Sequence, residues 1–205
     1  MTAWVAMSWT IISTNCSLKR FVAEVMPTAS ELGIRMCVHP DDPPRPLFGL
    51  PRIFSKQEDF EYLTALHDDL ANGITLCAGS LGASPHNNVP EIAEKFAKRI
   101  HFAHLRNVQI EEDGSFQESE HLDGAVRMPL LVWVLLQEEK NRQADDRADF
   151  NIPFRPDHGH ELLSDAEMET HPGYPLVGRL RGLAEIRGVI DGLNYASGER
   201  SQFGA

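Results

Sequence analysis

The sequence predicts an α/β fold made of about four strand–helix units, which corresponds to a partial TIM (β/α)8 barrel. Two observations predict it. Short apolar runs recur along the chain, and each run is followed by a segment with apolar residues at helical spacing. A complete barrel of this kind takes about 250 residues. The chain has 205 residues and shows strands enough for only half of one.

The first two units follow each other closely. Strands are expected at residues 34–38 and 74–77. Between them, Ser55 and Glu58 have the spacing of a capping box, which predicts the start of a helix that ends at Asn72–Gly73. A helical pattern also precedes the first strand, and its apolar stripe is Leu18, Phe21, Val22 and Val25.

The last two units are spaced more widely. A helix near Pro90 precedes the third strand, at residues 100–105. A polar insertion then separates this strand from a helix at 128–139. The fourth strand is expected at 152–154, and the last helix at 176–193.

The composition excludes several classes of protein. A formal net charge of −11 argues against nucleic acid or an anionic membrane as a partner. No apolar run approaches the roughly 18 residues that span a bilayer, and residues 1–17 lack the pattern of a signal peptide. The three cysteines form no CxxC pair, which is typical of the reducing cytoplasm.

The ends of the four predicted strands carry residues of the types that bind metals. In order these are His39, Cys77, His104 and Asp157. Each alone is more often a core or turn residue, but parallel strands bring their carboxyl ends to one edge of the sheet. Together they predict a single metal site. This ligand set suits zinc, and it also suits Fe(II) or Mn(II), so ligand chemistry alone does not choose the metal.

Several motifs containing these residues resemble those of one known family. HPDDPP, GITLCAGSLGA, HFAHLRN, RPDHGH, PGY and GRLRGLAEIRGV, in this order, are similar to the C-terminal half of the mannonate dehydratases. The resemblance runs from about Leu18 to about Leu193, so residues 1–17 form an unmatched segment before a half-barrel at 18–205. It implies a TIM-barrel lyase that uses Mn2+ or Fe2+ to convert D-mannonate to 2-dehydro-3-deoxy-D-gluconate in hexuronate catabolism.

The resemblance also implies roles for individual residues. It places the metal ligands on the same four residues at the strand ends, and it places proton transfer on His158 and Tyr174 without deciding which is the acid. Arg106 and Arg155 are candidates to bind the substrate carboxylate, and the alternative for each is a structural salt bridge. His121 is a candidate contact to sugar hydroxyls.

The match also has departures, and these leave alternatives open. The family usually has acidic residues near HLDG, where this chain has Ala125 and Arg127. The chain also lacks the first strands of the family's barrel, so its open sheet edges favour association into a homo-oligomer. Two alternatives to an active dehydratase are an inactive fragment that at most binds metal and a related metal-dependent sugar isomerase or epimerase.

Overall fold

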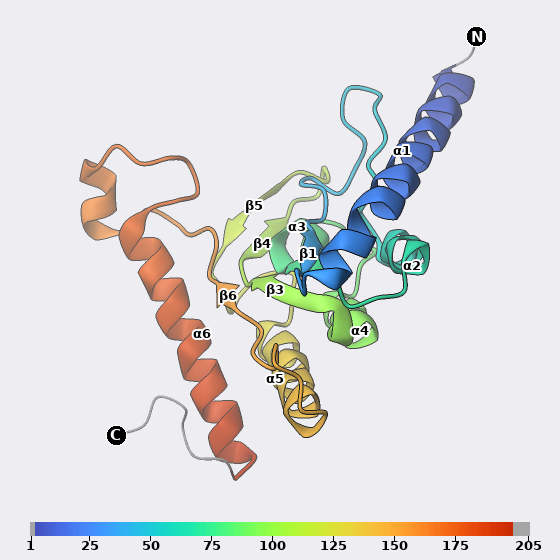
Figure 1. The fold of residues 1–205 in the computed structure, drawn as a ribbon. Coiled ribbons are helices and arrows are strands. Elements are labelled where there is room, and N and C mark those ends of the chain that lie inside the picture. Colours follow the sequence, from blue (N-terminus) through green and yellow to red (C-terminus); the bar gives the residue numbers. More distant parts are fainter. Residues whose placement is uncertain (1–2, 199–205) are drawn as a thin grey trace.

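A parallel four-stranded sheet lies at the centre of the structure, a computed structural model that describes the backbone of residues 3–198 and the side chains of residues 14–198 (Figure 1). The strand order is β1-β2-β3-β6. The strands are β1 (Met36–Val38), β2 (Asn72–Cys77), β3 (Ile100–His104) and β6 (Phe154–Arg155). Each neighbouring pair is parallel, so all four carboxyl ends lie at one edge of the sheet.

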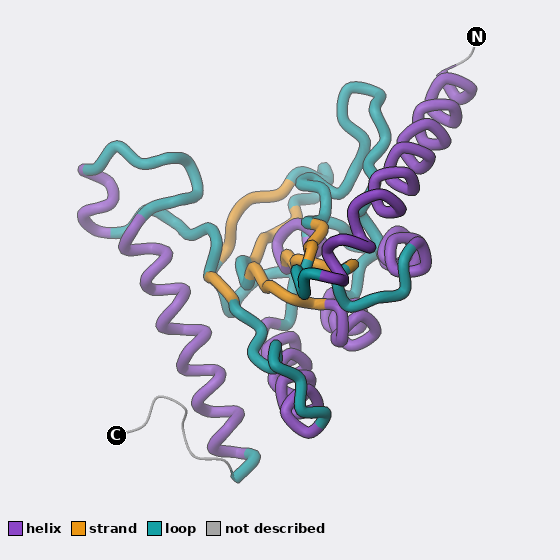
Figure 2. Tube along the Cα trace, in the orientation of Figure 1, coloured by secondary structure: helices purple, strands orange, loops and turns teal. Residues whose placement is uncertain are grey.

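Helices surround the sheet, with the strands gathered in the middle of the molecule (Figure 2). The two terminal helices extend away from this centre in different directions, and α5 lies below the sheet in the view of Figure 1. The helices are α1 (Ala3–Glu31), α2 (Gln57–Leu66), α3 (Ala78–Gly82), α4 (Val89–Phe96), α5 (Met128–Ala144) and α6 (Leu176–Ala196), with short 3-10 turns η1 (Ala97–Arg99) and η2 (Leu163–Glu167).

The core forms where helical apolar faces meet the sheet. All six residues of β2 are buried, as expected for a central parallel strand covered on both faces. One face of α4 contributes Ile92 and Phe96, and α5 contributes Leu131 and Val132. In the described part of the chain, no helix is both long and apolar enough to cross a bilayer.

All four predicted strands are observed, although the fourth, β6, shares only Phe154 with the expected range of 152–154. The helix of the first unit differs from the prediction at both ends. The carboxylate of Asp59, not of Glu58, accepts the backbone N–H groups of Ser55 and Lys56. The helix ends at Leu66, and the predicted stop at Asn72–Gly73 is wrong because these residues begin β2. The expected boundary at residues 17 and 18 falls inside α1, which continues across it.

The polar insertion after β3 contains an antiparallel hairpin that the sequence did not predict. Its strands are β4 (Asn107–Ile110) and β5 (Phe116–Ser119), with Val108 opposite Glu118. The buried amide of Asn107 fixes the base of the hairpin by donating to the carbonyls of His121 and Val126. The chain therefore enters the hairpin directly after β3, and the hydrogen bonds of Asn107 hold the segment that follows the hairpin close to the same point.

The segment between β6 and α6 is held by a buried carboxylate. Asp165, in η2, accepts the backbone N–H groups of Leu162, Val177 and Gly178. These hydrogen bonds hold the pKa of Asp165 below its ordinary value against the opposing effect of burial. The start of α6 is thus tied to the loop that precedes it, and Tyr174 lies between the two.

Candidate metal centre and active site

Three of the predicted ligands converge at the carboxyl edge of the sheet. Cys77 and His104 are the last residues of β2 and β3 and are direct partners in the register of these strands. His39 follows the end of β1. One potential ligand atom from each of the three lies within 4.8 Å of the others. Cys77 and His104 are buried, whereas His39 is exposed.

The fourth predicted ligand, Asp157, lies beside this group. Its Oδ2 is 3.5 Å from Nδ1 of His104, and the residue is 2% exposed. Its backbone has a φ of 67°, in the left-handed region that non-glycine residues seldom adopt. The turn after β6 thus reverses sharply at Asp157, which brings its carboxylate to the edge formed by the other strands.

The donor set fits a divalent metal ion. Nδ1 of His39 is 2.6 Å from the carbonyl oxygen of Pro40, so this nitrogen carries the proton and Nε2 presents a lone pair. That Nε2 lies 3.1 Å from Nδ1 of His104. Ligands bound to one ion at about 2.1 Å lie about 3 to 3.5 Å apart, which matches this spacing. A thiolate, two imidazoles and a carboxylate are the donor types that a transition metal takes.

His158 and Tyr174 lie side by side next to the predicted metal ligands. Nε2 of His158 is 3.1 Å from the Tyr174 hydroxyl, and the two rings are 4.7 Å apart. The same Nε2 is 4.0 Å from Oδ2 of Asp157. A basic nitrogen and a phenol hydroxyl at this distance are suited to exchange a proton.

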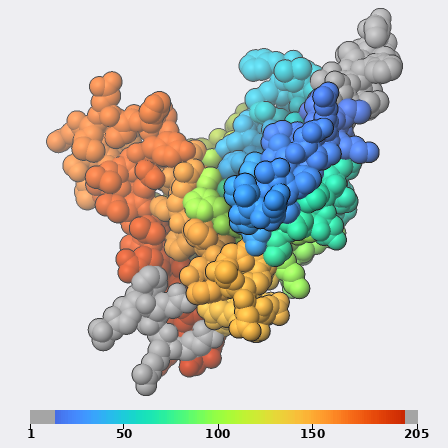
Figure 3. Space-filling view, viewed as in Figure 1, coloured from blue at the N-terminus to red at the C-terminus, as the bar shows by residue number. Residues whose placement is uncertain are grey.

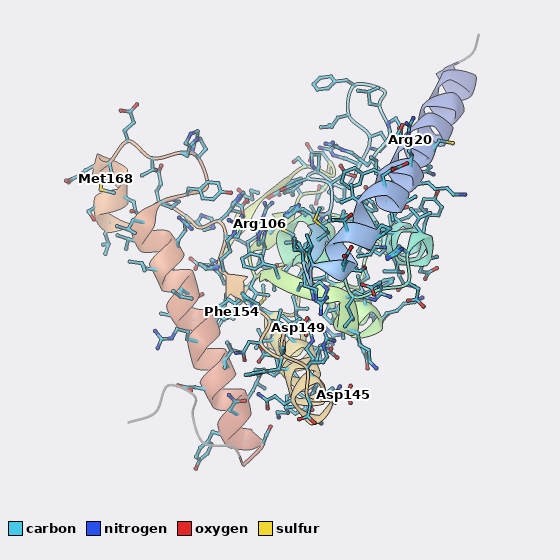
Figure 4. All side chains as sticks on the ribbon, viewed as in Figure 1. Arg20, Arg106, Asp145, Asp149, Phe154 and Met168 are labelled. Atoms are coloured by element: carbon cyan, nitrogen blue, oxygen red, sulfur yellow. The ribbon has the colours of Figure 1, made fainter. Side chains whose placement is uncertain are left out.

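The two candidate arginines have different environments. Arg106 is 3% exposed, and its Nη1 donates to Asp42 at 2.7 Å, while Nη2 lies 3.4 Å from Glu118. Burial acts to lower the pKa of Arg106, but the charges of Glu118 and Asp42 outweigh it and the pKa is raised. Both amino groups of Arg106, which is labelled in Figure 4, therefore already have carboxylate partners.

Arg155 is more available for an anionic substrate. Its side chain is 42% exposed, and Nη2 is 2.8 Å from Oδ1 of Asp157. His121, in contrast, is buried, and its Nε2 is 2.9 Å from the carbonyl oxygen of Pro156. Because a carbonyl only accepts, the imidazole donates there and supports the turn that carries Asp157. A contact from His121 to the substrate stays a prediction.

Three further residues touch this site without having been predicted. Ser80 donates its hydroxyl to Cys77 Sγ at 3.1 Å, and its place three residues after Cys77 at the start of α3 is a signal visible in the sequence. Arg179 donates to the carbonyl of Asp157 and lies 5.3 Å from the centre of the Tyr174 ring. Glu118 bonds His158, but no spacing rule points to it.

The sequence and the fold of this chain both resemble those of known proteins. The sequence profile of the D-mannonate dehydratase (UxuA) family matches residues 11–200. The chain belongs to the mannonate dehydratase family. Its curated relatives include the mannonate dehydratase of Rhizobium meliloti, 51% identical over 183 residues, and mannonate dehydratase 1 of Agrobacterium fabrum, 52% identical over 178 residues.

These matches cover most of this chain but about half of each mannonate dehydratase. They include 88% and 85% of the chain, but only 46% and 44% of the two relatives. The crystal structure of mannonate dehydratase from Streptococcus suis serotype 2 is similar in fold, with a TM-score of 0.80 at 36% identity. That likeness covers 93% of this chain and 52% of the other.

Proposed function

We propose that this chain carries the metal and proton-transfer site of a mannonate dehydratase, a hydro-lyase that removes water from D-mannonate to give 2-dehydro-3-deoxy-D-gluconate. The observation that carries the proposal is the convergence of His39, Cys77, His104 and Asp157 beside the pair of His158 and Tyr174. The ion is Mn2+ or Fe2+, and the setting is cytoplasmic hexuronate catabolism. Nucleic acid and membranes are not partners, in keeping with a net charge of −11.

The proposed fold is the C-terminal half of a (β/α)8 barrel. The parallel order β1-β2-β3-β6, with a ligand at or just after the end of every strand, supports it. In the described residues β1 and β6 each have one unpaired edge, which is consistent with association into a homo-oligomer. Residues 18–205 would make up this half-barrel.

The reaction breaks two bonds of the substrate. The C2–H bond breaks to a base, the C3–O bond breaks with protonation of the departing hydroxyl, and the resulting enol rearranges to the 2-keto acid. A divalent ion held by the four ligands would stabilise negative charge on the substrate oxygens. Arg155, the more exposed arginine, would bind the substrate carboxylate, and Arg106 and His121 are the further candidate contacts to the substrate.

His158 and Tyr174 supply the base and the acid between them. After one has taken the C2 proton and the other has protonated the leaving hydroxyl, each is in the wrong protonation state for another cycle. The 3.1 Å separation of His158 Nε2 from the Tyr174 hydroxyl allows one proton transfer to reset both groups.

The direct test is formation of 2-dehydro-3-deoxy-D-gluconate from D-mannonate by the purified chain with added Mn2+. We expect His158→Asn to keep the metal and to lower turnover by about 100-fold or more, because general acid–base groups contribute about that much. His160→Asn, at an exposed position two residues further on, is the matched control. Full turnover by the His158 variant would remove this residue from the mechanism.

A second candidate, a chain that binds metal without turnover, is favoured by one observation. The chain spans 46% of its relative from Rhizobium meliloti, so walls of the substrate site that lie elsewhere in that protein are not part of the matched region. Metal-loaded chain that forms no product would support this candidate over the active enzyme.

A further inference from the structure

The hairpin of β4 and β5 brings a carboxylate into contact with the proton-transfer pair. Glu118 lies on β5 opposite the buried Val108, so its side chain is on the face of the hairpin that is turned toward the protein. The side chains of Glu118 and His158 are only 24% and 20% exposed. Glu118 is therefore brought to the site by a strand paired in a hairpin, not by a loop.

One oxygen of Glu118 connects two groups of the site. Its Oε1 is 2.7 Å from Nδ1 of His158 and 3.4 Å from Nη2 of Arg106. Arg106 is itself held by Asp42 at 2.7 Å. Arg106 thus fixes the position of the Glu118 carboxylate, and the other close partner of this carboxylate is the imidazole of His158.

This contact determines which nitrogen of His158 carries the proton. An ionised carboxylate only accepts hydrogen bonds, so Nδ1 must donate to Glu118. In the neutral ring Nε2 then has no proton, and it accepts from the Tyr174 hydroxyl at 3.1 Å. Gly173, with a φ of 81°, leaves space for the ring, because a Cβ there would lie 3.2 Å from Nδ1 of His158.

We propose that Glu118 is a positioning residue that holds His158 in the tautomer with the proton on Nδ1, so that Nε2 faces Tyr174 and the substrate ready to exchange a proton. The geometry of Glu118 and His158 carries this inference, and only its effect on turnover rests on the proposed function. An alternative is that Glu118 serves only as a salt-bridge partner of Arg106, with no influence on the imidazole.

The tautomer can be read directly by nitrogen NMR of chain labelled with 15N-histidine, at about pH 8, where an ordinary imidazole is neutral. The His158 signals are identified by their absence from His158→Asn. We expect the native chain to carry the proton on Nδ1. A native spectrum with the proton on Nε2 overturns the proposal without any variant.

Two substitutions of Glu118 distinguish a role in orienting His158 from a role only as the salt-bridge partner of Arg106. Glu118→Gln keeps a carbonyl oxygen that can accept from Nδ1, so we expect the native tautomer to persist. Glu118→Leu removes both oxygens, so we expect the proton to shift wholly or partly to Nε2. Glu120→Leu is the control, because Glu120 lies two residues away and pairs with Arg181 at 2.8 Å instead. An unchanged His158 tautomer in Glu118→Leu would refute the proposal.

Kinetics provide the second readout. Loss of groups that orient catalytic or ligand residues typically costs about 10- to 100-fold. We expect Glu118→Leu to lower kcat on D-mannonate by that factor while KM changes less than about twofold, and Glu118→Gln to recover most of kcat. A native kcat in Glu118→Leu would overturn the positioning role. Absence of turnover in the native chain would count against the proposed function alone, because the tautomer measurement does not depend on it.

Discussion

Replacement of Cys77 by serine tests the proposed metal site most directly. Cys77 is fully buried at the end of β2, and its Sγ accepts from the hydroxyl and the backbone N–H of Ser80 at 3.1 and 3.5 Å. Serine is smaller and preserves polarity, but its hydroxyl does not ionise near neutral pH, whereas the thiolate is the form of cysteine that binds metals. The change removes one ligand with little disturbance of the strand.

The expected loss of metal affinity can be estimated from the effect of weaker changes around a metal site. Substitutions of residues that only support a ligand weaken metal binding by about 10- to 100-fold. Removal of one of four proposed ligands should therefore cost at least about 100-fold, which corresponds to about 2.7 kcal/mol of binding free energy. His39, His104 and Asp157 would still provide a weak site.

The assay is a titration with Mn2+ followed by electron paramagnetic resonance, together with the metal content per chain after gel filtration. Cys37→Ser is the matched control. Cys37 lies on β1, where burial raises the pKa of its thiol, and it is not among the three residues whose ligand atoms converge. Equal affinity in Cys77→Ser and native chain would refute the four-ligand site.

Three other predictions concern stability. Burial lowers the pKa of His101 to about 4, so the unfolded chain takes up a proton between pH 6.5 and 4 that the folded chain does not. Lowering the pH from 7 to 5 should thus cost the native chain about 2 kcal/mol of unfolding free energy more than His101→Gln, as measured by urea denaturation. Arg142→Met should destabilise by about 3 to 5 kcal/mol, because it removes the partner at 2.8 Å of the buried carboxylate of Glu138 and leaves it only Arg147, at 3.6 Å. Asp165→Asn should speed hydrogen exchange in the first turn of α6, because that carboxylate accepts backbone N–H groups there.

Each of these has a specific contrary outcome. Equal pH dependence in the native chain and the His101 variant would mean that the imidazole titrates normally in the fold. Arg181→Met, in an exposed pair with Glu185, should change stability little, and an equal loss from Arg142→Met and Arg181→Met would contradict the argument from burial. Unchanged exchange rates in Asp165→Asn would show that other contacts hold the start of α6.

Much of the proposed metal site could be read from the sequence because its parts are local. Each strand is a short apolar run, and the ligand lies at its end or within a few residues of it, as Cys77 does in β2. Parallel pairing then brings these ends together without knowledge of any side-chain contact. Cys77 and His104 face each other in register for this reason.

The predictions failed where a tertiary contact outweighed local preference. Asn72–Gly73 has the composition of a helix stop, yet the Asn72 side chain donates to the carbonyls of Leu63 and His67 and the residue begins a buried strand. The hairpin of β4 and β5 was missed because its sequence is polar and it lacks a short apolar run. Polar strands of this kind depend on anchors such as Asn107.

By itself the sequence determined the order along the chain of the four parallel strands and the longer helices, the residues at the strand ends and the resemblance to a family, because periodicity and motifs act over a few residues. Only the tertiary structure decided that Asp42 and Glu118 form salt bridges with Arg106. It also decided that Glu118 hydrogen-bonds to His158, which lies 40 positions further along the chain. Such contacts depend on where the hairpin and the turn after β6 meet in space. Distances of this kind are set by the packing of the whole fold, and no local pattern encodes them.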